Sequence, residues 1–157
     1  MNFSRLSQDS RVIFSEAFMK IPVTVKTHSV IHSEGDATPS VTTQRAEGEM
    51  EYTDERILLT YRDTEGEDEL FTRLSVEGEC VRLSLRGGSV SNLYFREGAE
   101  YDTVYSVAGF TFDAHVRCDR PSVKITPRGG EIRLSYEMTL GGDPRRARLL
   151  ISVSPRE

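Results

Sequence analysis

The sequence has few of the residues and segments that mark secreted, membrane-spanning or metal-binding proteins. Of its 157 residues only two are Cys and three are His. Two cysteines do not make the disulfide framework of a small secreted domain, and no apolar run is long enough to span a bilayer as a helix. A signal peptide needs a continuous apolar core, whereas the apolar residues 12–14 are flanked by Asp9, Arg11 and Glu16. We therefore expect a cytoplasmic protein.

The histidines, cysteines and acidic runs that are present lack the spacing of metal ligands. His28 and His32 lie in an alternating stretch, where residues four apart are separated by about 13 Å, so one zinc ion cannot reach both. Cys80 and Cys118 belong to no CxxC pair, and Cys118 continues an apolar phase, which predicts a buried thiol. Residues 63–69 are acidic but lack the Gly and Glu positions of a calcium loop. We expect no metal and no cofactor.

The charge of the chain is acidic overall and unevenly distributed. The net charge is −5, which argues against a general affinity for nucleic acid or anionic membranes. Residues 1–109 carry 11 Lys and Arg against 19 Asp and Glu, whereas residues 110–157 carry 9 against 6. Arg145, Arg146 and Arg148 form a basic cluster too small to indicate nucleic-acid binding. This uneven distribution of charge either orients a protein partner or reflects two faces of a solvated barrel.

The clearest positive signal is a hairpin pattern in residues 129–153. Apolar side chains alternate with polar ones, a period of two that places them on one face of a strand. Residues 141–144, Gly-Gly-Asp-Pro, interrupt this alternation with turn-forming residues. A lone hairpin is marginally stable in water, so its apolar face must pack against further strands. The apolar positions are Ile132, Leu134, Tyr136, Met138 and Leu140, then Ala147, Leu149, Ile151 and Val153.

Most of the remaining chain repeats the same alternation. Turn signals recur every 8–12 residues, which predicts an all-β protein with short connections between antiparallel neighbours. Such a meander removes its edges most easily by closing on itself, so we favour a barrel of roughly 8–10 strands over a sandwich. Gly48 predicts a bend or bulge within one strand. Further strands are expected at residues 21–31, 38–53, 57–61, 70–76, 81–85, 90–94, 101–105, 110–118 and 123–125.

Residues 1–20 do not follow the strand pattern. Phe14, Ala17, Phe18 and Ile21 have the spacing of a short amphipathic helix, which would act as a lid on one end of the barrel. The alternative is that Met19 is the native start and that the preceding residues are dispensable. We divide the chain into an N-terminal helical extension or lid, residues 1–20, and a barrel domain, residues 21–157.

Several stretches resemble the YwiB-like family of uncharacterised bacterial proteins. They are IPVTVKTHSVI at residues 21–31, ILLTYRD at 57–63, LRGGSVSNLYFREG at 85–98, YSVAGFTFD at 105–113 and IRLSYEMTL at 132–140. The resemblance spans residues 21–153 and rests on turn glycines and strand hydrophobes in a particular order. It implies a calycin-like, lipocalin-related β-barrel. It supplies no active site, because the family has no assigned biochemical role.

The sequence contains no recognisable catalytic motif. Asp113, His115 and Arg117 alternate on one strand face, but nothing nearby reads as a nucleophile elbow or an oxyanion loop. The paired glycines at 87–88 and 141–142 are hairpin turns without the helix start that cradles a phosphate. We therefore expect a binding protein rather than an enzyme.

The inner face of the barrel carries the candidate binding site. A cavity-bearing barrel mixes apolar walls with a few polar anchors, whereas a small filled barrel is almost entirely aliphatic. One hypothesis is a small, partly apolar or amphipathic ligand held inside. The other is a filled barrel that docks a protein partner through its charged outer surface. The polar residues expected on the inner face are Tyr61, Thr72, Asn92, Thr103, Tyr105 and Tyr136, and all but Thr103 are predicted ligand-binding residues.

Overall fold

The computed structural model describes residues 18–65, 68–87 and 89–156. This part of the chain consists of strands joined by turns, and none of its segments is a helix long and apolar enough to cross a membrane. The strands are β2 (Met19–Ser33), β3 (Ser40–Tyr52), β4 (Arg56–Glu65), β5 (Asp68–Glu77), β6 (Cys80–Gly87), β7 (Ser89–Phe95), β8 (Glu100–Val107), β9 (Phe110–Cys118), β10 (Ser122–Thr126), β11 (Gly129–Leu140) and β12 (Asp143–Pro155).

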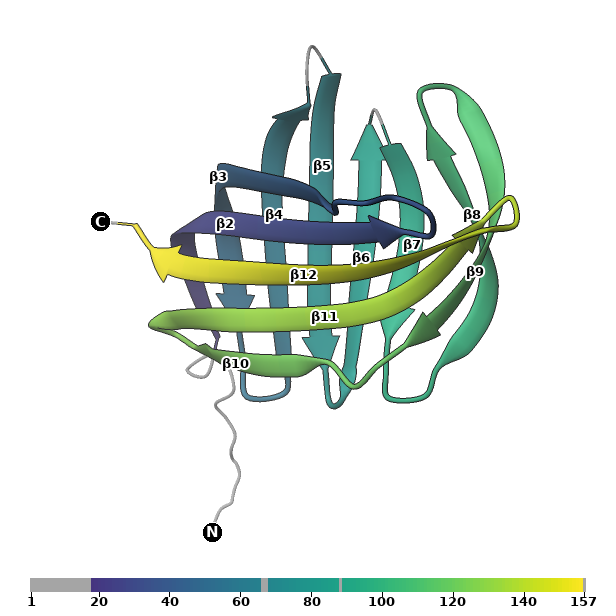
Figure 1. Ribbon diagram of the computed structural model, residues 1–157. Helices are drawn as coiled ribbons and strands as arrows, with labels where there is room; N and C mark the ends of the chain where they lie inside the picture. Colours follow the sequence, from purple (N-terminus) through teal and green to yellow (C-terminus); the bar gives the residue numbers. More distant parts are fainter. Residues whose placement is uncertain (1–17, 66–67, 88, 157) are drawn as a thin grey trace, which may run out of the picture.

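The strands form one antiparallel sheet that closes on itself. Consecutive strands pair from β2 to β9, β11 pairs with β12, and β12 pairs with β2. The ring is completed where the end of β11 pairs with β9, with Tyr136 opposite Cys118 and Leu140 opposite Ala114. The short strand β10 pairs with the beginning of β11. In Figure 1, β2, β10, β11 and β12 cross in front of the steeper strands β4–β9. The predicted closed meander barrel is therefore confirmed, with ten strands in the ring.

The helix expected near the N-terminus is not found in the described part of the chain. Residues 1–17 lie outside that part, and the last residue of the helical pattern, Ile21, belongs to β2. Ile21 lies opposite Met50 of β3, in the same alternating phase as the fully buried Val23 and Val25. The strand therefore begins at Met19, because pairing with β3 gives the backbone N–H and C=O groups there their hydrogen-bond partners.

Gly48 marks a change in how β3 is paired. The whole of β3 after Ser40 runs beside β2, but only Gly48–Tyr52 pairs with β4. A Cβ atom on Gly48 would lie 2.3 Å from the carbonyl oxygen of Thr60 and 2.7 Å from Cβ of Tyr61. Only glycine lets the two strands approach so closely. The sequence predicts a bend or bulge at Gly48, and what the structure shows there is a close approach of β3 to β4 at the point where their pairing begins.

The apolar core fills one end of the barrel. Its largest fully buried side chains come from strands all round the ring, so the two crossing parts of the sheet pack directly on one another. Burying one such side chain contributes about 1.5–3 kcal/mol to folding. The residues are Val23, Val25, Met50, Leu59, Leu74, Val81, Phe95, Val116, Ile132, Leu134 and Ile151.

Candidate functional site

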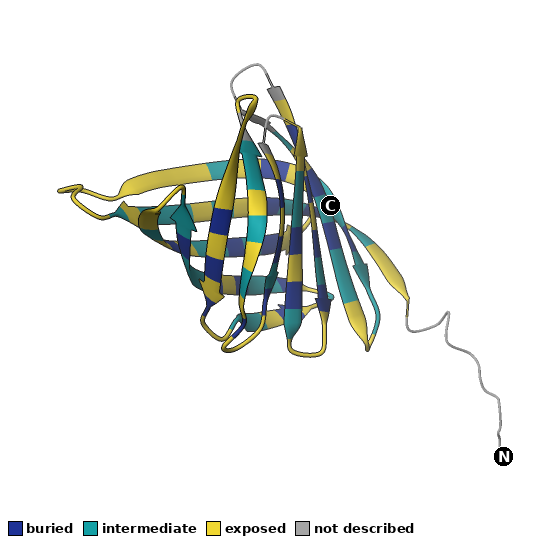
Figure 2. Cartoon of the chain, turned by 90° about the vertical axis from the view of Figure 1, so that its right-hand side faces the viewer, coloured by how far each residue is buried: buried dark blue, intermediate teal, exposed yellow. Residues whose placement is uncertain are grey.

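The inner face of the barrel divides into a packed half and an open half. The turns that join β2–β3, β4–β5, β6–β7, β8–β9 and β11–β12 lie at the same end, because consecutive turns of a meander alternate between the two ends. Many inward-facing side chains near these turns are only partly buried, although Leu70, Ser91 and Met138 there are buried. The largest fully buried apolar side chains lie toward the opposite end. Figure 2 shows this mixture of buried and intermediate segments along the strands. The half-buried inner residues of the open half are Thr27, Ser29, Ile31, Gln44, Leu85, Thr103, Tyr105, Tyr136, Leu140 and Leu149.

Strand β9 shows the change of environment within one strand. Cys118, Val116 and Ala114 face inward and are at most 3% exposed, whereas Phe112, next in the same phase, is 38% exposed. Cys118 is thus buried as predicted, and burial raises the pKa of its thiol. Along a single inner face, the barrel passes from a dry core to a region that water reaches.

Tyr61 and Thr72 form a polar pair where the packed and open halves meet. The two residues lie opposite each other on β4 and β5, both are buried, and their side chains are hydrogen-bonded. Burial raises the pKa of Tyr61 to about 12; the bond with Thr72 offsets this in part, and the negative charge of Asp63 adds to it. Both predicted site residues therefore face inward, and Tyr61 stays protonated at neutral pH.

Tyr136 on β11 and Tyr105 on β8 also face the interior of the barrel, and their side chains pack against the core. Tyr136 is half-buried, and its ring centroid lies 5.2 Å from that of Phe95. Burial raises the pKa of Tyr136, and the nearby tyrosines Tyr105 and Tyr101 raise it further. Tyr105 is half-buried and packs against the core, as does Tyr101. The structure therefore brings the phenol groups of β8 and β11 together inside the barrel.

The inward orientation expected for Asn92 is wrong. Asn92 is exposed on the outer surface, where its side-chain oxygen accepts a hydrogen bond of 2.9 Å from the Ser84 hydroxyl. The sequence of β7 is ambiguous, because apolar or aromatic residues occupy both phases. The inner phase is the one that contains Leu93 and Phe95, which lie opposite Leu83 and Val81 of β6.

The corrected phase of β7 places Ser91 inside the barrel. Ser91 is 1% exposed, and its hydroxyl has no hydrogen-bond partner in the described part of the structure. Sequence reasoning missed this residue because it assigned the wrong face of β7 to the interior. The signal that identifies it is its spacing of two and four residues from Leu93 and Phe95.

A tyrosine closes the seam between β7 and β8. The two strands pair only at Ser89–Val107 and Val90–Ser106. Farther along their boundary, hydrogen bonds from the Tyr101 side chain take the place of backbone hydrogen bonds between the strands. Its hydroxyl accepts a hydrogen bond from the backbone N–H of Tyr94 and donates one to the carbonyl of Tyr94, both at 2.9 Å. The two rings stack with centroids 4.1 Å apart. Burial raises the pKa of Tyr101 to about 12.

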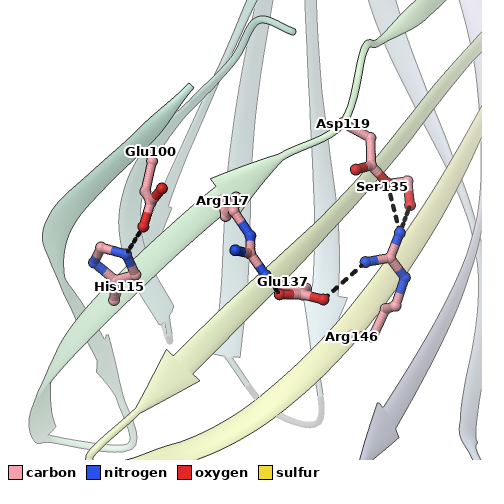
Figure 3. A network of polar contacts seen from close by, with 7 residues as sticks. All are labelled: Glu100, His115, Arg117, Asp119, Ser135, Glu137 and Arg146. Carbon is pink, nitrogen blue, oxygen red and sulfur yellow. Dashed lines mark hydrogen bonds and ion pairs between the residues drawn. The ribbon is translucent and has the colours of Figure 1, made fainter. Parts of the chain in front are cut away.

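The outer surface of β9, β11 and β12 carries a network of paired charges (Figure 3). Glu137 accepts hydrogen bonds from Arg117 and Arg146, and Arg146 also reaches Asp119 at 2.5 Å and Ser135 at 3.3 Å. These residues are exposed or half-buried and join β9, β11 and β12.

His115 lies on the same surface between two carboxylates. Its Nε2 is 2.6 Å from Glu100 and its Nδ1 is 2.7 Å from Asp102, and both contacts raise its pKa. His115 and Arg117 therefore lie on the outer face, opposite Ala114, as their alternation predicts. The described residues form no group of three or more His, Cys, Asp and Glu side chains that would hold a metal ion.

The best-defined hollows among the described residues lie on the outer surface and at the rim. One of about 600 Å³ is bordered by Thr103 and Ala114 near the β11–β12 turn, at the open end. Another, of about 420 Å³, lies on the outer face of β2, β11 and β12, near the exposed His28. His32, four residues further along β2, is also exposed.

Comparison with known proteins agrees with this architecture. The fold matches the crystal structure of ywiB protein from Bacillus subtilis with a TM-score of 0.77, over 91% of this chain and 98% of that one, at 19% sequence identity. No curated protein sequence matches the chain. Residues 23–149 match the family model described as Domain of unknown function (DUF1934). As the resemblance to YwiB-like proteins predicted, the chain belongs to the DUF1934 family.

Proposed function

We propose that this calycin-like barrel binds a small, partly apolar molecule in its open half. The observation that carries the proposal is the Ser91 hydroxyl, which is buried and has no partner in the described structure. Ser91 faces inward opposite Leu85, one of the half-buried residues of the open half. Leaving a buried polar group without a hydrogen bond costs about 1–3 kcal/mol. A ligand with a carbonyl, hydroxyl or amide group would recover that cost.

Other inward-facing side chains of the barrel supply the rest of such a site. Leu85, Leu140 and Leu149 offer an apolar wall that is only partly buried. Tyr136 and Tyr105 offer phenol groups at the boundary with the packed core, and the Tyr61–Thr72 pair lies on the far side of β6. Small-molecule sites combine mostly apolar walls with a few polar groups that fix orientation. Because burial keeps Tyr61 and Tyr136 protonated, we expect a neutral polar group on the ligand.

A titration with the neutral, polarity-sensitive dye Nile red tests the proposal. In a Thr103→Phe variant, the larger ring enters the open half from β8 and should weaken dye binding roughly tenfold or more. The matched control is Val104→Phe, which adds a ring at the next position of the same strand, where the side chain is 52% exposed on the outer face. Equal binding by both variants and the unmodified chain would contradict an interior site.

A further inference from the structure

The outer face of the barrel carries a second, separate feature on β2, β10, β11 and β12. These four strands lie side by side, as Figure 1 shows. A hollow of about 420 Å³ lies on this face. The side chains that face outward there include Arg133, Ser135, Arg148, Leu150, His28 and Val30.

The charge of this hollow is of one sign. Arg120, Arg133 and Arg148 border it, and no Asp or Glu is among its lining residues. Arg133 forms an ion pair with Glu131 on its own strand, at 3.2 Å. In the described part of the chain, no ion pair is found for Arg120 or Arg148. The hollow therefore concentrates positive charge on a protein whose net charge is −5.

A nearby arginine on the same surface shows the contrast. Arg146 precedes Arg148 by two residues and points to the same side of β12, but it is paired with both Glu137 and Asp119. Arg148 lies opposite Ser135 and Val30 on its two neighbouring strands, and neither of these can neutralise a guanidinium group. Among the described residues, two arginines without an ion pair, Arg120 and Arg148, therefore border the hollow.

Aliphatic side chains lie beside the arginines across the strands. Leu150 lies between Arg133 on β11 and His28 on β2, and Arg148 lies beside Val30. Val30 is opposite Val41 of β3, which is 57% exposed. The surface therefore offers guanidinium groups and outward-facing aliphatic groups within a few ångströms of each other.

We propose that this face docks an acidic segment of a partner protein that also carries aliphatic side chains. Arginine binds carboxylates through two parallel hydrogen bonds, and arginines are enriched in protein interfaces. The exposed borders of the hollow, among them Arg133, Arg148 and His28, cannot enclose a small molecule in the way that a ligand pocket does. A nucleic acid is disfavoured because no aromatic side chain borders the hollow for base stacking and the chain as a whole is acidic.

Fluorescence anisotropy with labelled peptides tests the proposal on the full chain. The probe is a twelve-residue peptide that alternates Glu with Leu, and the comparison probes are an all-Glu peptide, a Lys–Leu peptide and single-stranded oligothymidylate. We expect the Glu–Leu peptide to bind most tightly. Arg148→Glu should weaken its binding at least tenfold, whereas Arg73→Glu, the same charge change at an exposed position on β5, should change it less than twofold.

Replacing Leu150 separates docking from simple charge attraction. Leu150→Ser should weaken the Glu–Leu peptide severalfold and leave any binding of the all-Glu peptide unchanged. Three results would each overturn the proposal: no binding of the Glu–Leu peptide by the unmodified chain, equal losses in the Arg148 and Arg73 variants, or tighter binding of the oligothymidylate than of the peptide.

Discussion

The two halves of the barrel differ in what their inner faces do. In the packed half, Leu59, Leu74 and Val116 are completely buried and make a dry core. In the open half, the same alternating phase presents Thr27, Ser29 and Thr103, which remain half-buried. One half therefore supplies the stability of the fold, and the other is free to hold polar groups that a folding core would exclude.

The largest effect on stability is expected from truncating a buried side chain in the packed half. Phe95 is fully buried and contacts the Tyr136 ring, so Phe95→Ala should lower the free energy of unfolding by about 3–5 kcal/mol. The corresponding truncation in the open half, Leu85→Ala, should cost only about 1 kcal/mol, because Leu85 is half-buried. Urea unfolding of both variants checks the contrast. Equal losses would show that the barrel is packed uniformly.

The next effect concerns the seam between β7 and β8. Tyr101→Phe removes the hydroxyl that bonds both backbone groups of Tyr94 while keeping the ring stack. Leaving these groups without partners should cost about 1–3 kcal/mol. Hydrogen exchange should also become faster at the Tyr94 amide and stay unchanged in the β4–β5 ladder. Unchanged exchange at Tyr94 would mean that the hydroxyl does not hold the seam.

A smaller effect should separate binding from stability at Tyr136. Tyr136→Phe retains the ring against Phe95 and removes only the phenol hydroxyl. The free energy of unfolding should change by about 1 kcal/mol or less. The dissociation constant of Nile red should rise by up to roughly tenfold if the hydroxyl faces the bound molecule. A loss of stability with unchanged dye binding would assign Tyr136 to the packed half.

The smallest effect is a pH dependence on the outer surface. Glu100 and Asp102 raise the pKa of His115 above its ordinary value of 6.5. The stabilisation from this contact is therefore complete below about pH 6.5 and is lost as the pH rises through the raised pKa. Thermal melts should show that His115→Gln loses more stability relative to the unmodified chain at pH 5.5 than at pH 8.5. The opposite trend would contradict the raised pKa.

Most of the architecture could be predicted from alternation and turn residues, and the reason lies in the strength of the pattern. The hairpin of β11 and β12 has one strictly apolar face, and its phase is the one found in the structure. In β7, by contrast, Val90 and Tyr94 in one phase compete with Leu93 and Phe95 in the other. Only the cross-strand contacts with β6 decide between them, and a single sequence does not contain these contacts.

The candidate site was predictable to the extent that its residues lie on unambiguous strands. Tyr61, Thr72, Tyr105 and Tyr136 face inward as expected. Ser91 was missed for the same reason that Asn92 was misplaced, because a one-residue change of phase exchanges the two faces of a strand. The division into packed and open halves also exceeds what alternation can show, because it depends on where neighbouring strands end.

The most direct test of the account replaces Ser91 by Ala and measures stability and binding on the same sample. Removing a buried hydroxyl that has no partner among the described residues should leave the free energy of unfolding unchanged or raise it by about 1 kcal/mol. If that hydroxyl serves a ligand, the dissociation constant of Nile red should rise roughly five- to tenfold. A destabilised Ser91→Ala variant that binds the dye as tightly as the unmodified chain would contradict the account.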